Sequence, residues 1–469
     1  MKITPIYIRS LQLAGVKTFS GQTELRMGGD DGKISNWTLI LGENGIGKST
    51  LLQCVAWMKP ALPYDVADLD ELKPAPLIND EENEVLERLV SKFSPTHLKA
   101  EIRGHFVANQ PLGKLPDPKQ ALAVCETSMI VGVNKDRKLL SVDPDVVTER
   151  RDVFYKDEVV VYGYSASRVL GKQNLAESKM LDTIPGFINE KSELYDAEEI
   201  LHTVNYAKLG ATNKKEMEKY DKLISNIKLM LVDVLPDYEE IDSIDILPPK
   251  VLLSDPDGGV IINTKYGKKI PFSDFSLGYK TITSWTIDLA WRMFNKYQAS
   301  SSKPLNEPAI VLIDEIDLHL HPIWQRDIMQ NLSKHFPNIQ FIATAHSPLM
   351  VQAALDYNYA VVNFDESEGR LIIRNRPEEL DGWRVDQILT SDIFGLESAR
   401  GAKYDKLITE HRKLLALKRP NKSQQQELKN IESELRQIPT GEDPEEIKRK
   451  RQIEELYDKV MNRNNSFTK

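Results

Sequence analysis

Cysteine and long apolar runs are both scarce in this sequence. The two cysteines, Cys54 and Cys125, cannot build a disulfide framework, and their spacing fits no zinc site. No stretch approaches the roughly 18 apolar residues that a transmembrane helix needs. Residues 1–10 also lack the apolar segment of a signal peptide. We therefore expect a cytoplasmic protein with no membrane partner.

An excess of positive charge is missing as well. The net charge is −9, which argues against a protein that coats nucleic acid by overall charge, although a local basic groove would not show in this total. Contact with DNA therefore stays open. The chain does have size: its 469 residues, 41% of them apolar, leave room for roughly two or three domains with a buried core.

The segment LILGENGIGKST (39–50) carries the first chemical motif. It matches the pattern G-x-x-x-x-G-K-[S/T], and it lies between a buried strand that ends at Leu41 and an amphipathic helix that begins at Ser49. Such a loop points backbone N–H groups at phosphate oxygens, while Lys48 adds a positive charge and the Ser49 hydroxyl can bind Mg²⁺. The predicted nucleotide-binding residues here are Gly42, Asn44, Gly45, Gly47, Lys48, Ser49 and Thr50.

Two acids follow a strand of five apolar residues, 309–313. Asp314 and Glu315 stand at its carboxyl end, where parallel α/β sheets place their ligands. Asp314 suits the Mg²⁺ shell opposite Ser49, and Glu315 suits the polarisation of a water for attack on the γ-phosphorus. The sequence therefore predicts a catalytic centre for phosphoryl transfer at this strand end.

Histidines occur at two places near these acids. His346 follows the buried strand in segment 339–348, where its ring can hydrogen-bond a γ-phosphate oxygen or the attacking water. His319 and His321 form an H-x-H pair, which fits either a zinc site or packing within a turn. Because no third ligand with suitable spacing stands nearby, turn packing is favoured.

A hydroxyl and a glycine begin a long helix within residues 271–294. Ser276 and Gly278, at the N-terminus of this helix, can form an anion site. The chain thus has two phosphate-binding helix starts, one more than a single nucleotide bound by a single chain requires. The second start is explained if it serves a nucleotide on a neighbouring chain.

Four segments resemble, in this order, the motifs of a known family: GENGIGKST, FSLGYKT, LIDEIDLHLHP and TAHSP. They are similar to the phosphate loop, the signature motif, the Walker B motif with its D-loop, and the switch histidine of ABC-type ATPases in the RecF, Rad50, SMC and OLD group. The resemblance implies an α/β, ABC-type P-loop NTPase fold with an antiparallel β subdomain, a helical insertion and a C-terminal helical tail. It also implies ATP and Mg²⁺ as cofactors, with Glu315 and His346 as catalytic residues.

The resemblance further implies a homodimer through shared ATP sites, or a higher homo-oligomer. Ser276 and Gly278 of one chain would close over ATP held by Lys48 of the other. Asp317, in the D-loop, would communicate across this interface. In this arrangement the second anion site completes the nucleotide site of the neighbouring chain.

Two positions depart from the signature motif of transporters. Leu277 stands where glycine is usual, and Tyr279 stands where glutamine or glutamate is usual. These departures weaken an assignment as the nucleotide-binding subunit of a transporter. The motifs do not place the family's Q-loop glutamine, for which Gln110 and Gln173 are the candidates.

A finer resemblance rests on SLGYK, VYGYSASR, HLHP and the segment GWRVDQILTSDIFGLESARG (382–401). These look like the stand-alone ATPases of bacterial anti-phage systems, nearest the ATPase subunit of Septu, which is encoded with an HNH nuclease. The resemblance implies an ATP-hydrolysing subunit of an anti-phage defence complex. Nucleotide-dependent dimer closure would regulate a partner nuclease of the HNH type.

Two other functions compete with this one. The first is a DNA-repair ATPase of the RecF or Rad50 kind that acts on DNA ends or gaps, and the second is the transporter subunit. No heptad array is long enough for the coiled-coil arm of Rad50. The residues after His346 show no acidic cluster at a strand end, so we expect no nuclease activity of the chain's own.

The motifs and patterns predict two domains. An ABC-type ATPase domain is expected at 1–365, with a β-rich subdomain within 57–156 and a helical insertion within 169–250. A helical domain is expected at 366–469, where charge-rich helices carry apolar stripes. Such stripes serve either packing or the docking of a partner, and the sequence favours neither.

Overall fold

A computed structural model describes residues 3–29, 31–60, 85–92, 98–118, 121–154, 159–173, 175, 183–235, 244–248, 259–265, 267–377, 382–391, 393–396, 402–415, 417 and 421–436. Parts of the expected β-rich subdomain and of the helical tail, 61–84 and 437–469, lie outside these ranges. The chain divides into two compact units, Met1–Phe394 and Gly395–Lys469. The domain boundary at 365 stays a prediction, although a strand that follows it, β16 (Arg370–Asn375), joins the central sheet of the first unit.

The central sheet of the first unit has six strands in the order β16-β15-β3-β14-β13-β7. Their bounds are β3 (Trp37–Leu41), β7 (Val161–Tyr164), β13 (Ala309–Ile313), β14 (Ile339–Thr344), β15 (Asn358–Asp365) and β16 (Arg370–Asn375). All neighbours are parallel except β15 and β16. Since both faces of this sheet are covered, every residue of β3, β13 and β14 is buried, and most are apolar, as in parallel strands generally.

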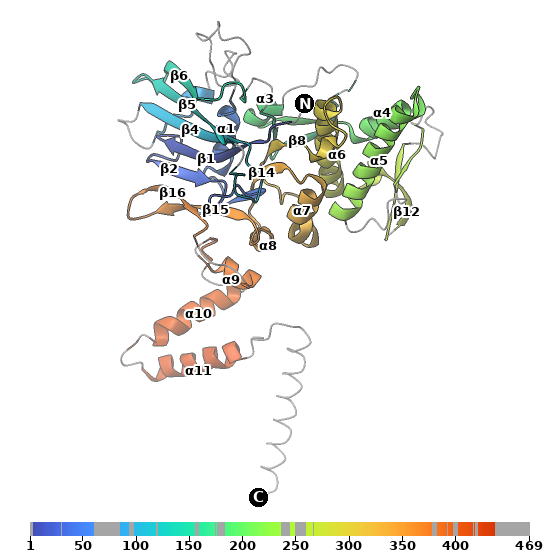
Figure 1. The fold of residues 1–469 in the computed structure, drawn as a ribbon. Coiled ribbons are helices and arrows are strands. Elements are labelled where there is room, and N and C mark those ends of the chain that lie inside the picture. The colour runs from blue at the N-terminus through green and yellow to red at the C-terminus, as the bar shows by residue number, and fades with distance from the viewer. Residues whose placement is uncertain are drawn as a thin grey trace, which may run out of the picture. The chain divides into compact units, whose positions relative to one another are not determined.

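A five-stranded antiparallel sheet covers one face of the central sheet, and its order is β2-β1-β4-β5-β6. It consists of β1 (Ile6–Ala14), β2 (Thr23–Arg26), β4 (Lys99–Ala108), β5 (Ala123–Val133) and β6 (Leu139–Thr148). Helix α1 (Lys48–Trp57) packs in the same hydrophobic core as this sheet (Figure 1). The antiparallel subdomain is therefore confirmed, but it also contains β1 and β2, which precede the phosphate loop.

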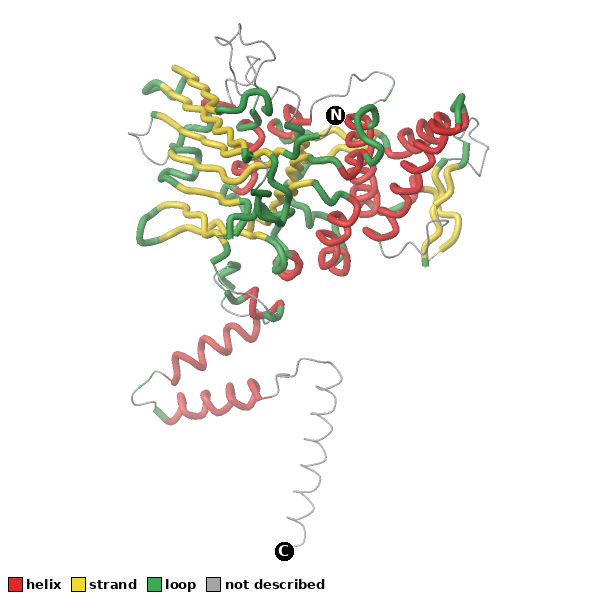
Figure 2. The backbone as a smooth tube through the Cα atoms, viewed as in Figure 1, coloured by secondary structure: helices red, strands yellow, loops and turns green. Residues whose placement is uncertain are grey.

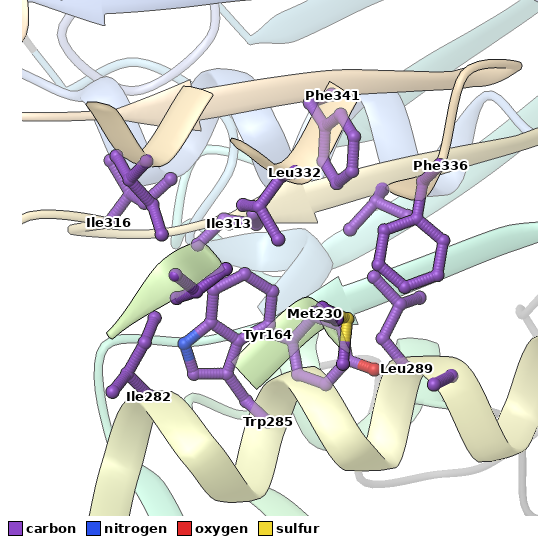
Figure 3. Close-up of a cluster of buried hydrophobic side chains, with 14 of the residues drawn as sticks. Tyr164, Met230, Ile282, Trp285, Leu289, Ile313, Ile316, Leu332, Phe336 and Phe341 are labelled. Atoms are coloured by element: carbon purple, nitrogen blue, oxygen red, sulfur yellow. The ribbon is translucent and has the colours of Figure 1, made fainter. Parts of the chain in front are cut away.

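Helices cover the opposite face of the central sheet (Figure 2). The long helix α6 (Leu277–Tyr297) and helix α7 (Pro322–His335) lie next to the sheet, and α8 (Pro348–Ala353) follows β14. Figure 3 shows Trp285 and Leu289 of α6 in one buried cluster with Tyr164 of β7 and Ile313 of β13. The signature helix and the Walker B strand therefore share a core.

The helical insertion follows β7. Its elements are β8 (Arg168–Gln173), α3 (Thr183–Ile188), β9 (Ser192–Tyr195), α4 (Ala197–Leu209) and α5 (Lys214–Val234). Helix α5 begins because Asn213 accepts a hydrogen bond from the N–H of Glu216. The strands β8 and β9 pair in parallel, and the chain then forms a three-stranded sheet from β10 (Ile244–Ile246), β11 (Val260–Thr264) and β12 (Gly267–Pro271). The insertion predicted from the spacing of apolar residues is thus present.

The remaining elements are short or lie near the C-terminus. They are β10 (Ile244–Ile246), β11 (Val260–Thr264), β12 (Gly267–Pro271), the 3-10 helices at Phe272–Asp274 and Pro304–Asn306, α9 (Val385–Leu389), α10 (Ala402–Leu415) and α11 (Lys422–Arg436). In the second unit, α10 and α11 contact each other. Among the helices described, none is both long enough and apolar enough to cross a membrane.

Candidate nucleotide-binding and catalytic site

The phosphate loop has the backbone geometry of an anion site. Gly42, Gly45 and Gly47 have φ angles of 143°, 76° and 102°, in the region that favours glycine. A Cβ atom on Gly42 would lie 2.6 Å from the carbonyl oxygen of Val362, whereas one on Gly45 would meet nothing within 4 Å. Gly47 is the N-cap of α1, and no side chain of the described residues caps this helix. The first N–H groups of α1 are therefore left for a ligand.

Lys48 is buried within this loop, with 5% of its surface exposed. Its Nζ donates to the carbonyl oxygens of Gly42 and Glu43, at 2.7 Å each, and lies 3.4 Å from Nδ1 of His346. Burial lowers the pKa of Lys48 to about 8, and the nearby carboxylates of the Walker B and D-loop segment oppose this shift. A phosphate at the loop would give this ammonium group an anionic partner.

The two Walker B acids differ in their surroundings. Asp314 is buried, and its Oδ1 accepts a hydrogen bond of 2.6 Å from the Thr344 hydroxyl. Glu315 leaves 37% of its side chain exposed, so its carboxylate can reach a water. Its φ angle is 49°, and a non-glycine residue in this region costs about 1–2 kcal/mol. Thr344 ends the neighbouring strand β14, and it was not among the predicted site residues.

His346 and Asp317 complete the cluster. Nε2 of His346 lies 4.0 Å from Oε1 of Glu315, and burial, together with the charge of Lys48, lowers the pKa of His346. Oδ2 of Asp317 accepts hydrogen bonds from the backbone N–H groups of His346 and Ser347, at 2.9 and 2.7 Å. Asp317 therefore holds the switch-histidine loop within its own chain. Its communication across a dimer interface remains a prediction.

The signature residues lie against the D-loop. Ser276 is the N-cap of α6, and its side chain makes no capping hydrogen bond to the described residues. A Cβ atom on Gly278 would lie 2.6 Å from the carbonyl oxygen of His319, so only glycine permits this approach. Leu277, between them, is 57% exposed. No hydrogen bond or ion pair of the described chain links Ser276 or Gly278 to Lys48.

The H-x-H pair belongs to the turn before α7. His319 has a φ angle of 65°, and Nδ1 of His321 accepts a hydrogen bond of 3.3 Å from the N–H of Ile323 as the N-cap of this helix. Within the described ranges, no group of three or more histidine, cysteine, aspartate or glutamate side chains is placed to hold a metal ion. The position of His321 is explained by its role as the N-cap of α7.

Of the two candidates for the Q-loop glutamine, one lies away from the catalytic cluster. Gln110 is buried in the antiparallel subdomain, where its Nε2 donates to the carbonyl oxygens of Gly32 and Lys114, so it does not join the cluster. The side chain of Gln173 lies outside the described parts. Arg168, the first residue of β8, instead donates from Nη2 to the carbonyl oxygens of Asp314 and Glu315. An arginine just beyond a buried strand was the only signal of this contact in the sequence.

A family model described as an AAA ATPase domain matches residues 172–351 of this chain. The matched range contains the signature residues, both Walker B acids and His346. It begins after the phosphate loop, whose geometry is described above. The family match therefore covers the acids, the signature residues and His346, whereas the evidence for the phosphate loop comes from its geometry.

Three curated relatives also match, and one of them covers more of the chain than the family model does. The Septu protein PtuA of Bacillus mycoides (strain KBAB4) is 26% identical over 407 residues, which cover 86% of this chain and 47% of that protein. The Septu protein PtuA of Bacillus thuringiensis is 35% identical over 163 residues, or 33% of this chain and 40% of that protein. The Retron Vc95 probable ATPase of Vibrio cholerae serotype O1 biovar El Tor is 44% identical over 99 residues, or 21% of this chain and 19% of that protein.

The chain spans less than half the length of each of these relatives. The structure shows directly that the predicted site residues lie together: the charges of Lys48, Asp314, Glu315, Asp317 and His346 are close enough to interact. The parallel sheet, the antiparallel subdomain and the helical insertion agree with the expected fold class. The geometry and the matches agree with a P-loop NTPase fold, and the chain is similar to the Septu protein PtuA of Bacillus mycoides over 86% of its own length.

Proposed function

We propose that this chain binds ATP with Mg²⁺ and hydrolyses it as the ATPase subunit of an anti-phage defence complex. The observation that carries the hydrolysis is the convergence of Lys48, Glu315 and His346 at the carboxyl ends of β3, β13 and β14. A phosphate-binding lysine, an accessible carboxylate and a histidine with a lowered pKa have distinct roles in phosphoryl transfer. The packing of the strand ends requires none of these three groups.

The residues present fit the cofactors. The uncapped N-terminus of α1 and the ammonium group of Lys48 would bind the phosphates, and Asn44, Gly45 and Thr50 belong to the same loop and first turn. The Ser49 hydroxyl, which makes no hydrogen bond to the described residues, and the Asp314 carboxylate would hold Mg²⁺. Bound Mg²⁺ would neutralise charge on the β- and γ-phosphates.

Different side chains would carry out the separate tasks in the attack of water on the γ-phosphate. Glu315 orients the attacking water and accepts its proton at a carboxylate oxygen. His346 is neutral at pH 7, because its pKa is lowered, so its ring can orient the water or a γ-phosphate oxygen without adding a charge. Thr344 holds Asp314 in place through its hydroxyl.

The nucleotide site is proposed to be shared between two copies of the chain. The N-terminus of α6 carries an uncapped Ser276 and an exposed Leu277, and no bond of the described chain ties it to its own phosphate loop. Such a helix start can bind a phosphate held by another copy. ATP would then stabilise a closed homodimer, and hydrolysis would release it. Higher homo-oligomers would use further surfaces.

The defence role rests on the relatives. Two of them are Septu PtuA proteins and a third is a retron ATPase. We propose that the closed and open dimers bind a partner HNH-type nuclease differently, so that ATP regulates the nuclease through a few kcal/mol of differential affinity. The partner would supply the DNA cleavage.

Hydrolysis by the purified chain tests the core of this proposal. Phosphate release is measured with Mg²⁺, with excess chelator, and with the Lys48→Ala variant. We expect release only from the wild-type chain with Mg²⁺, together with an intact plasmid in the same reaction. Equal release by Lys48→Ala would refute the phosphate-loop assignment, and plasmid cleavage by the isolated chain would refute the need for a partner nuclease.

A further inference from the structure

Arg168 contacts the backbone on both sides of Glu315. Its Nη2 donates to the carbonyl oxygen of Asp314 and, at 3.3 Å, to that of Glu315. These two carbonyl groups belong to the two peptide units that flank the Cα atom of Glu315. One guanidinium group therefore holds both peptide units that determine the direction of the Glu315 side chain.

Thr344 holds the same two peptide units from the other side. The N–H of Glu315 donates to the Thr344 hydroxyl at 2.7 Å, and the N–H of Ile316 donates to the Thr344 carbonyl oxygen at 3.0 Å. The four hydrogen bonds engage the C=O and N–H of each peptide unit. We call this arrangement the Glu315 clamp, formed by Arg168 and Thr344.

The clamp coincides with an unfavourable backbone conformation. Glu315 has a φ angle of 49°, and an unrestrained glutamate would leave this region for a more favourable one. Strained residues persist only where the surrounding structure fixes them, and such residues cluster at functional sites. The clamp supplies the hydrogen bonds that fix this one.

Arg168 also retains a polar atom that packing alone would not require. Its Nε is buried and has no hydrogen-bond partner among the described residues. Burial lowers the pKa of Arg168 to about 10, with the carboxylates of Asp314 and Glu315 opposing the shift, so the group stays charged at neutral pH. A buried cation kept beside two catalytic acids suggests a role in the site.

We infer that Arg168 is a positioning residue, which holds the strained backbone of Glu315 so that the carboxylate faces the attacking water. The inference rests on the proposed ATP hydrolysis, but the residue acts through Glu315 rather than by touching ATP. It stands where the chain leaves β7 for the helical insertion, and Ser165, three positions earlier, exchanges hydrogen bonds with Ser192 of β9. The clamp therefore lies at the joint between the insertion and the catalytic acids.

Turnover and nucleotide binding separate positioning from general stability. In Arg168→Met we expect kcat to fall about 10- to 100-fold, because a misdirected base loses that much, while KM, the dissociation constant for ATP and the Tm stay close to wild type. Arg168→Lys should recover part of kcat, since an ammonium group reaches the carbonyl oxygens without the planar fork. The matched control is Arg137→Met, which also removes an arginine that donates to a backbone carbonyl, that of Ser91, far along the chain from the acids.

A double-variant comparison asks whether Arg168 acts through Glu315. On a Glu315→Gln background, measured by single-turnover hydrolysis, adding Arg168→Met should change the residual rate less than about twofold. A merely structural arginine would lower both backgrounds alike. Wild-type kcat in both Arg168→Met and Arg168→Lys, or a loss that multiplies with that of Glu315→Gln, would overturn the inference.

Hydrogen exchange provides a readout without nucleotide. In the nucleotide-free protein, the amides of Glu315 and Ile316 should exchange faster in Arg168→Met than in wild type, because half of the clamp is gone. The peptide around β1, Ile6–Ala14, serves as the internal reference. If the wild-type chain hydrolyses no ATP, the proposed function fails, while this measurement still decides the clamp: unchanged exchange at both amides would refute it.

Discussion

Nε2 of His346 lies 4.0 Å from Oε1 of Glu315. The two residues follow the carboxyl ends of β14 and β13, which are neighbouring strands in the sheet although Ile339 at the start of β14 comes 26 residues after Ile313 at the end of β13. The distance leaves the two groups close enough to act on one water without a direct hydrogen bond. Because the pKa of His346 is lowered by burial and by Lys48, the pair differs in charge at pH 7. One group can accept a proton while the other orients the water.

Replacement of the carboxylate should stop turnover and spare binding. In Glu315→Gln we expect hydrolysis to fall by at least about 100-fold, as the loss of a general base does, with ATP affinity retained and the closed dimer trapped. Phosphate release and size-exclusion chromatography with ATP measure the two effects. Glu366→Gln, an exposed acid in the turn after β15, is the control; wild-type turnover in Glu315→Gln would exclude the catalytic role.

ATP affinity should depend on pH through Lys48. In the nucleotide-free protein its pKa is about 8, so the ammonium form prevails below pH 8 and is lost as the pH rises above it. We therefore expect the dissociation constant for ATP to increase between pH 7 and pH 9, measured by calorimetry.

The Lys48→Ala variant is the control for this titration. Without the ammonium group, affinity should be about 10- to 100-fold weaker at pH 7, because a charge-assisted contact is lost. It should then vary little over the same pH range. A pH dependence that persists in Lys48→Ala would assign the effect to another group.

Shared sites should allow rescue between two inactive variants. Ser276→Arg blocks the signature helix start, and Lys48→Ala disables the phosphate loop. If each site combines Lys48 of one copy with Ser276 of another, every mixed dimer has one intact site, and random 1:1 exchange restores about a quarter of wild-type activity. Phosphate release is measured after mixing, with cross-linking to show that mixed dimers form. Mixed dimers without activity would indicate a site complete within one chain.

The buried ion pair of α6 should matter for stability. Asp288 and Arg292 are 0% and 1% exposed, with Nε and Oδ2 2.6 Å apart, and the Tyr164 hydroxyl donates to the same carboxylate oxygen. Arg292→Met leaves a buried carboxylate without its cation, so we expect a loss of about 3–5 kcal/mol in the free energy of unfolding. Urea denaturation measures it. Arg326→Met, an exposed arginine of α7, should change stability by less than about 0.5 kcal/mol, and a similarly small change in Arg292→Met would disprove the argument.

The strand-end rule was enough to predict the centre of the site. Asp314 and Glu315 follow a strand found at the predicted residues, Ala309–Ile313, and His346 follows its neighbour β14. Their positions could be predicted because each of these polar residues closely follows a run of mostly apolar residues in the sequence. Their roles stay predictions, whereas their proximity is a feature of the fold.

Arg168 and Thr344 could not be found in the same way. Both contact the backbone around Glu315, Arg168 from the start of β8, which follows β7, and Thr344 from the end of β14. The sequence predicts that β14 lies beside β13, but it does not reveal that β7 lies on the other side of β13, nor which side chains reach the backbone of Glu315. Of the two candidates for the Q-loop glutamine, Gln110 lies in the antiparallel subdomain, and the side chain of Gln173 is outside the described parts.

The last prediction concerns the binding of a partner nuclease by the C-terminal unit. Leu414 of α10 and Ile431 of α11 are buried, whereas Leu415, the last residue of α10, and Leu417, which follows that helix, are 57% and 41% exposed. Part of the apolar stripe is therefore consumed by packing, and the exposed leucines are the part left for docking. Removal of the chain from Lys403 onward should abolish co-purification with an HNH-type nuclease and leave ATP binding intact.

A finer variant separates docking from folding of this unit. Leu415→Asp combined with Leu417→Asp places charges on the exposed positions and should weaken nuclease binding, whereas Glu410→Gln, at an exposed position of α10, should not. Pull-downs at several ATP concentrations, with plasmid cleavage as the second readout, measure both binding and its regulation. Because ATP can shift the partner only through a difference in affinity between closed and open dimers, nuclease binding that ignores both the tail and the nucleotide would refute the regulatory role.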